Sequence, residues 1–225
     1  MTPYSRFAIY YTPPEGEFSA RAARWLGWDI AAGQRAEHPQ IDGLDVAGIT
    51  ETPRKYGFHA TIKAPFRLAA GAEPALLQRR LTEFAATQAP VTLEGGLTLA
   101  RLGGFVAGVP ASPSAALQDL AANTVRALDD LRAPLSEAEI ARRRPERLSP
   151  AERANLDQWG YPYVMDAFRF HMTLSGDLAD PAPVIAALED YLGPHIPRPL
   201  TIEALTLCGE AEGRFHQIAR VPLGG

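Results

Sequence analysis

Apolar and polar residues alternate with two different periods along the chain. Apolar side chains recur at helical spacing over residues 17–26, 73–88, 114–131 and 183–192, and a serine and a proline at 149–150 cap a further helix that ends near residue 160. Short runs rich in branched and aromatic residues predict strands over residues 6–11, 58–65, 91–93, 97–102, 105–109, 168–175, 200–207 and 214–221. Residues 33–56 follow neither period, and we expect a long loop there.

The strand predicted over residues 58–65, FHATIKAP, has two chemically different faces. Because side chains alternate along a strand, its apolar residues fall on one face, and His59, Thr61 and Lys63 fall on the other. This pattern places a histidine one pleat away from a threonine.

The strand predicted over residues 168–175, FRFHMTLS, repeats the arrangement. Its apolar residues share one face, while the other face carries Arg169, His171, Thr173 and Ser175. A single H-x-T is a weak motif, but two copies, each behind a phenylalanine and each on a two-faced strand, favour a common site.

The order of the elements indicates an internal duplication. Each half has a histidine strand, a helix just after it and a pair of strands after that, although the halves share little sequence outside the motif. We predict an α+β fold in one bilobal domain over residues 1–225, with lobe segments of roughly 1–110 and 111–225. Exchange of strands between the lobes is left open.

The composition is that of a globular chain that can bury a sizeable core, since 46% of its 225 residues are hydrophobic and 21% are charged. A formal net charge of −4 argues against a protein that coats long nucleic acid, because binding to the phosphate backbone requires clustered lysines and arginines. A small phosphorylated ligand is compatible with this balance, because it needs only a few local donors.

Cys208 is the single cysteine, which excludes an internal disulfide and a cysteine-rich zinc site. The N-terminal residues include no basic segment followed by an apolar run of signal-peptide length, and no apolar window reaches the roughly 18 to 20 residues that span a bilayer. We expect a cytoplasmic monomer that does not associate with membranes.

Two histidine–threonine pairs around one phosphate can hydrolyse a phosphodiester without a metal. The reaction needs a base for the attacking oxygen, an acid for the leaving oxygen, and donors for the charge on the phosphoryl oxygens. Imidazoles can supply the base and the acid near neutral pH, and threonine hydroxyls can donate to the non-bridging oxygens. Which histidine is the base stays open. A metal site built on His59 and His171 is the main chemical alternative, but neither motif has a second ligand at metal spacing.

These residues resemble the 2H phosphoesterases, a family named for two H-x-[ST]-x motifs, which here read HATI at residues 59–62 and HMTL at residues 171–174. The blocks RFAIYYTPP, RWLGWD, TPRKYGFHATIKAPF and ERLSPAERANLDQWGYPYVMDAFRFHMTLSG are similar to one branch, the proteins assigned to phosphonate metabolism and often encoded with carbon–phosphorus lyase genes. The resemblance covers nearly the whole chain. It implies a two-lobed, duplicated α+β fold in which antiparallel sheets form a central cleft and helices lie outside.

The resemblance also implies a hydrolase without cofactor or metal, a cyclic phosphodiesterase with His59 and His171 as its acid–base pair and Thr61 and Thr173 as phosphate donors. The branch points to a ribose cyclic phosphate as the substrate. Two alternatives stay open: an enzyme that opens 2′,3′-cyclic phosphates at RNA ends, and a non-catalytic module that binds a phosphorylated metabolite.

Several neighbours of the motifs are candidates for substrate binding. Lys63 and Arg169 lie on the histidine faces of their strands, so that either can meet an anionic group. The alternatives that stay open are a surface position for Lys63 and a structural ion pair for Arg169. Three tyrosines flank the motifs and can stack on a sugar or base, or pack between the lobes: Tyr56, Tyr161 and Tyr163. The sequence leaves open whether residues 33–56 or the arginines at 142–144 cover the site.

Overall fold

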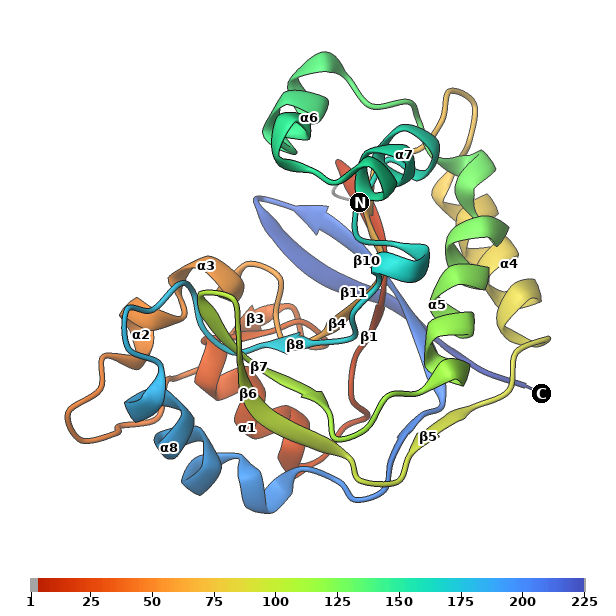
Figure 1. The fold of residues 1–225 in the computed structure, drawn as a ribbon. Coiled ribbons are helices and arrows are strands. Elements are labelled where there is room, and N and C mark those ends of the chain that lie inside the picture. The colour runs from red at the N-terminus through yellow and green to blue at the C-terminus, as the bar shows by residue number, and fades with distance from the viewer. Residues whose placement is uncertain (1–3, 225) are drawn as a thin grey trace.

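A seven-stranded antiparallel sheet organises the chain in this computed structural model, which describes residues 4–224 (Figure 1). Its strands lie side by side in the order β11 (Arg214–Pro222), β10 (Ala204–Ala211), β1 (Arg6–Tyr11), β4 (Ala60–Phe66), β8 (Met172–Thr173), β7 (Phe105–Pro110) and β6 (Leu97–Leu102). Two short ladders lie beside it, β2 (Trp28–Asp29) with β3 (Gln34–Arg35), and β5 (Val91–Leu93) with β9 (Leu200–Ile202).

The sheet joins the two halves of the chain by exchanging their strands. β10 and β11, from the end of the chain, pair with each other and with β1, while β8 pairs with β7 from the first half. The two parts of the sheet meet at β4 and β8, which pair through Ala60 and Met172. The expected α+β fold is confirmed, and its sheets are joined into one at the strands that carry the motifs.

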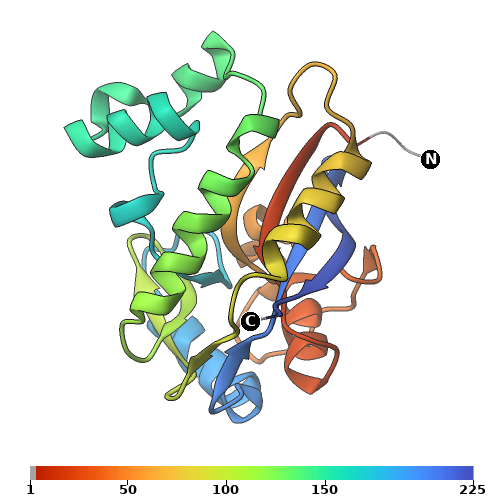
Figure 2. The same ribbon diagram turned by 90° about the vertical axis from the view of Figure 1, so that its right-hand side faces the viewer.

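Two helices cover one face of the sheet. Figure 2 shows α4 (Pro74–Ala85) and α5 (Ala115–Ala127) lying side by side, with α4 against β10 and β11 and α5 against β4. Leu77 and Leu81 of α4 are fully buried, and Leu120 of α5 is nearly so, as their helical spacing predicts. Burying each such leucine is worth roughly 1.5–3 kcal/mol. This packing holds β4 in place beneath the site, together with β10 and β11.

The remaining helices lie around the edges of the sheet. α8 (Ala182–Tyr191) packs on β6, and α1 (Glu17–Leu26) packs on β2 and on the short helices α2 (Val46–Ile49) and α3 (Glu51–Arg54). α6 (Glu137–Arg142) and α7 (Pro150–Trp159) form a separate layer beyond one end of the sheet (Figure 1). Single 3₁₀ turns complete the fold: Asp129–Leu131, Pro145–Arg147, Met165–Ala167 and Gly193–His195. No helix among residues 4–224 is long and apolar enough to cross a bilayer.

The predicted helices form, and local capping explains their ends. Ser149 accepts a hydrogen bond from the backbone of Glu152, whose carboxylate bonds back to the Ser149 backbone, and Gly160 ends α7 in the left-handed conformation. The segment 33–56 differs from the expected loop, because it contains β3, α2 and α3. The strand expected over residues 168–175 is shortened to the two residues of β8.

Candidate active site

The backbone holds both motif histidines in the same way. Nδ1 of His59 lies 3.0 Å from the carbonyl oxygen of Gly57, and Nδ1 of His171 lies 2.8 Å from that of Arg169. Because a carbonyl oxygen can only accept, each Nδ1 carries a proton and donates it, which leaves each Nε2 as the ring atom that can exchange a proton with a ligand. The same bond, made to the residue two positions earlier, therefore selects the same tautomer in both motifs.

The ring of His59 is further fixed by its neighbours. The ring of Tyr10 stacks on it at a centroid distance of 3.8 Å, and the Thr61 hydroxyl lies 3.1 Å from its Nε2, to which it donates. Gly57 supplies the anchoring carbonyl at φ +68°, and a Cβ at this position would lie 2.7 Å from Cβ of Ile30. Glycine is therefore required where the chain turns into the first motif.

Burial lowers the pKa of His59 to about 4, although the hydrogen bond to Gly57 opposes this change. A positive charge on His171 would lower the pKa of His59 further, which places the two rings within electrostatic reach of each other. His59 is therefore neutral near pH 7, with Nε2 able to accept a proton.

Two cavities meet at the motif residues. One, of about 410 Å³, is lined by Thr61, and the other, of about 520 Å³, is lined by His171; His59, Tyr56 and Thr173 line both. The threonine of the second motif therefore opens into the same cavity as the histidine and threonine of the first. The structure brings all four motif side chains to this pair of cavities, which lie within the size range of small-molecule sites.

The tyrosines predicted to flank the site occupy different positions. Tyr56 lines both cavities, stacks on Phe215 at 5.4 Å and lies 5.9 Å from the His59 ring. Tyr161 lines only the cavity of about 410 Å³. Tyr163 lines neither cavity; it is 49% exposed and meets the edge of Tyr161. Substrate contact is therefore open to the first two tyrosines and not to Tyr163 in this arrangement.

Arg169 does not project into either cavity. Its side chain is exposed, and its contribution to the site is the backbone carbonyl that binds His171. The alternation predicted for this segment holds, because Phe168, Phe170 and Met172 are buried while Arg169 and His171 lie on the more exposed face. Contact between the Arg169 guanidinium and a substrate anion stays a prediction.

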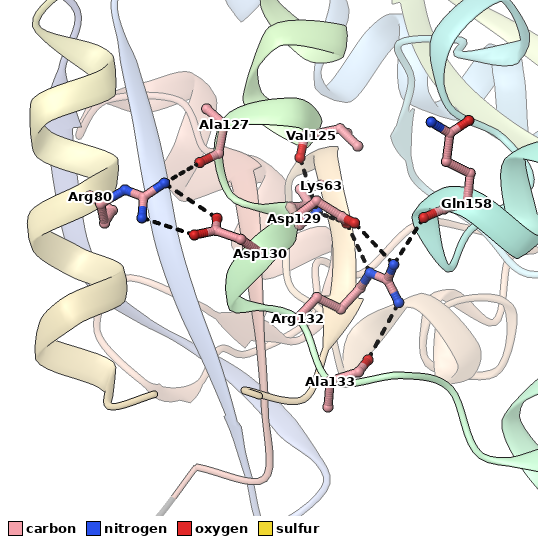
Figure 3. Close-up of polar contacts among 9 residues, drawn as sticks. All are labelled: Lys63, Arg80, Val125, Ala127, Asp129, Asp130, Arg132, Ala133 and Gln158. Atoms are coloured by element: carbon pink, nitrogen blue, oxygen red, sulfur yellow. Dashed lines mark hydrogen bonds and ion pairs between the residues drawn. The ribbon is translucent and has the colours of Figure 1, made fainter. Parts of the chain in front are cut away.

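Lys63 was expected on the face of Thr61, and this expectation is wrong. Thr61 pairs with Tyr10, but the next residue of β1, Ile9, pairs with Lys63, so that β4 has one extra residue here. This β-bulge reverses the alternation and turns Lys63 toward α5. Its ammonium donates to the Asp129 carboxylate at 2.9 Å (Figure 3). Lys63 is buried in this ion pair and does not line either cavity.

The structure adds residues that sequence reasoning missed or left open. Tyr10 lies on the site face of β1, which alternation alone could not decide, and Arg6 and Lys55 also line the cavity of about 410 Å³. Arg142 and Arg143 line it from the end of α6, whereas Arg144 does not. The arginine run was the sequence signal for these two cations, but only the fold brings them to the motifs. Within residues 4–224, no group of three or more His, Cys, Asp or Glu side chains is placed to hold a metal ion.

Residues 61–216 match the model of one protein family, DUF1045, described as a protein of unknown function. The chain belongs to the DUF1045 family. The match includes Thr61 and the whole second motif, while His59 lies just before it.

Two similar bacterial proteins carry the name ribose 1,5-bisphosphate phosphokinase PhnN. The one from Janthinobacterium sp. (strain Marseille) is 36% identical over 234 residues, covering 98% of this chain and 51% of that protein. The one from Laribacter hongkongensis (strain HLHK9) is 34% identical over 183 residues, covering 77% of this chain and 40% of that protein. The chain thus spans about half the length, or less, of these relatives.

Solved structures with a similar backbone trace include a protein described as a phosphoesterase. Its TM-score is 0.47 and its sequence identity 13%, and the match covers 99% of this chain and 100% of that chain. They also include LigT of E. coli complexed with 3′-AMP, with a TM-score of 0.49 and 16% identity over the full length of both chains.

Proposed function

We propose that this protein is a metal-independent 2H phosphoesterase that hydrolyses a small cyclic phosphodiester. One observation carries the proposal: the two H-x-T histidines make the same Nδ1–H bond to a backbone carbonyl and line adjoining cavities that share Thr173. Two Nε2 atoms held in this way are suited to one phosphate that lies between them.

In the proposed reaction, His59 is the base, because its lowered pKa keeps it unprotonated near pH 7. It takes a proton from water as the water oxygen bonds to phosphorus. The bond from phosphorus to one ester oxygen breaks, and His171, protonated on Nε2, gives this oxygen a proton. When substrate is bound, the Thr61 hydroxyl turns from Nε2 of His59 to the phosphate, and Thr61 and Thr173 donate to the non-bridging oxygens, where negative charge builds up. The product is a phosphomonoester, and proton exchange with solvent restores both histidines.

A ribose cyclic phosphate is the substrate that we favour. The size of the cavities suits a sugar phosphate rather than a polymer. Two relatives carry the name of an enzyme that acts on ribose 1,5-bisphosphate, and opening a cyclic phosphate on a phosphorylated ribose yields a compound of that class. This supports a role in phosphonate catabolism, and we propose that the protein acts in the cytoplasm as a monomer.

A nucleotide substrate is the second candidate, and the aromatic lining of the larger cavity favours it. The ring centres of Phe105 and His171 lie 5.7 Å apart, and Tyr56 lines the same cavity. Aromatic side chains at such a position can stack on a nucleobase. An enzyme for 2′,3′-cyclic phosphates at RNA ends would use the same histidines and place its base here.

The proposal is tested by turnover in the presence of a chelator. Purified protein treated with EDTA is supplied with ribose 1,2-cyclic phosphate, nucleoside 2′,3′-cyclic phosphates and oligonucleotides that end in a 2′,3′-cyclic phosphate, and phosphomonoester formation is followed by ³¹P NMR. We expect hydrolysis, fastest for the ribose compound, and its loss in both His59→Ala and His171→Ala variants that keep the fold by circular dichroism.

His195→Ala is the matched control, because this histidine lines neither cavity. Full activity in either motif variant would refute the mechanism. A preference for nucleotide substrates would select the second candidate. Tight binding of these compounds without turnover would instead identify a non-catalytic module that binds a phosphorylated metabolite.

A further inference from the structure

The cavity of about 410 Å³ beside His59 has a wall of positive charge. Arg142 and Arg143 line it from α6, Lys55 lines it from the chain before β4, and Arg6 lines it from β1. The chain as a whole has a formal net charge of −4, so this local concentration of positive charge is opposite in sign to the net charge of the protein. Such a cluster in a cavity attracts anions.

Three of these four cations have no carboxylate partner among residues 4–224: Lys55, Arg142 and Arg143. Arg6 differs, because it binds both carboxylate oxygens of Glu210 at 2.6 and 2.8 Å. The guanidinium of Arg143 lies 4.8 Å from the ring centre of Tyr161. An aromatic face positions a cation without neutralising its charge.

The one carboxylate in the wall is already bound. Glu139 accepts hydrogen bonds from the Arg67 guanidinium at 2.8 Å and from the backbone and side chain of Ser136 at 2.8 and 3.0 Å. The Arg67 bond and the Ser136 backbone bond lower the pKa of Glu139 to about 2. These bonds hold the start of α6 in place and leave the arginines at its end available to a ligand.

A buried hydroxyl group also points to a ligand. Tyr10 is fully buried and lines this cavity, and its hydroxyl has no hydrogen-bond partner among residues 4–224. Buried hydroxyls are nearly always hydrogen-bonded, because leaving one unpaired is costly. A phosphate oxygen in the cavity would supply the missing acceptor.

A cyclic phosphodiester alone does not account for this wall. The diester carries one negative charge, and the proposed mechanism already gives its oxygens two threonine donors and two histidines. A phosphomonoester carries about two charges near neutral pH, and guanidinium groups bind its oxygens in pairs. Resting on the proposed function, we propose that the substrate carries a second phosphate, a monoester, which Arg142, Arg143 and Lys55 bind.

The test compares two substrates that differ only in this group. In ribose 1,2-cyclic phosphate, the exocyclic hydroxyl at carbon 5 is free to carry a phosphate. The two substrates are therefore ribose 1,2-cyclic phosphate and its 5-phosphate. Wild-type protein, the Arg142→Gln/Arg143→Gln double variant and an Arg144→Gln control are compared by kcat/KM. Arg144 belongs to the same run and does not line the cavity. Thermal unfolding verifies that all three proteins are folded.

We expect the wild type to prefer the 5-phosphorylated compound by roughly 10- to 100-fold, as for the loss of one or two hydrogen bonds between charged groups. The double variant should lose this preference, while its kcat/KM for the unphosphorylated compound stays within about threefold of the wild-type value. Arg144→Gln should keep the wild-type preference for the 5-phosphorylated compound. Equal kcat/KM for both compounds in the wild type would overturn the inference and leave the proposed function standing. An equal loss for both compounds in the double variant would also overturn it.

Absence of turnover for either compound would refute the proposed function separately. The second phosphate is then judged by titration calorimetry with the same two compounds and the same three proteins. Tighter binding of the 5-phosphorylated compound, lost in the double variant alone, supports the subsite. Equal affinities in the wild type overturn it.

Discussion

Replacing Lys63 separates a structural role of this residue from a role in substrate binding. Its nearly fully buried ammonium donates to the Asp129 carboxylate at 2.9 Å and to the Val125 carbonyl at 3.3 Å, as Figure 3 shows. Lys63→Met keeps the apolar stem and removes the charge. Asp129 then still accepts two bonds from Arg132, at 2.9 and 3.1 Å.

The size of the effect follows from what each variant leaves unpaired. Losing a hydrogen bond between charged groups costs roughly 1.5–3 kcal/mol, and breaking a buried ion pair from one side costs roughly 3–5 kcal/mol. Because Arg132 still compensates Asp129, we expect Lys63→Met to lower the free energy of unfolding by about 2 kcal/mol. Asp129→Asn leaves Lys63 and Arg132 without their carboxylate, and should lower it by about 3–5 kcal/mol.

Urea denaturation followed by tryptophan fluorescence measures both variants. Arg79→Met is the control, since the Arg79–Glu83 pair is exposed and spans 3.9 Å, and its loss should change the free energy of unfolding by less than about 0.5 kcal/mol. Below its unfolding temperature, Lys63→Met should hydrolyse substrate at the wild-type rate. A variant as stable as the wild type but inactive would refute the reasoning, because Lys63 would then contact the substrate.

Three further predictions concern the site. The pKa of His59 is about 4 in the folded protein and has its ordinary value of 6.5 in the unfolded protein. Between pH 4 and pH 6.5, the unfolded state therefore binds more protons than the folded state. The contribution of neutral His59 to the free energy of unfolding is complete above pH 6.5 and is lost as the pH falls toward 4, by at most about 2 kcal/mol at pH 5. When His59→Ala is denatured at pH 7, 6 and 5, its free energy of unfolding should depend less steeply on pH than that of the wild type. An unchanged slope would contradict the assignment. Tyr10→Phe removes an unpaired buried hydroxyl, so the free energy of unfolding should stay constant or rise by about 1 kcal/mol. Calorimetry should show a loss of about 2- to 10-fold in the affinity of this variant for inorganic phosphate. Unchanged affinity would exclude contact between this hydroxyl and the anion. Thr61→Val and Thr173→Val should each lower kcat on the order of 10- to 1000-fold in steady-state assays, because each removes one donor to the developing charge, and wild-type kcat in either variant would rule out that role.

Several features of the site could be predicted from local sequence because they depend on neighbouring residues alone. The alternation within the first motif places His59 and Thr61 on one face, and the structure keeps them there, with the Thr61 hydroxyl 3.1 Å from Nε2 of His59. The cap at Ser149 and the left-handed Gly160 set the ends of α7 in the same local way. Period and capping are short-range properties, so they can be read from the chain before any partner strand is known.

Other features depend on contacts between distant segments, and only the tertiary structure decided them. Lys63 turns away from the site because β4 has a bulge where it pairs with β1. Nothing within β4 alone encodes this change. The face of Tyr10 follows from the same pairing. Arg142 and Arg143 reach the motifs because Arg67, a long way earlier in the chain, binds Glu139 at the start of α6. The sequence by itself determined the two histidine–threonine pairs, and the packing of distant segments decided which other side chains surround them.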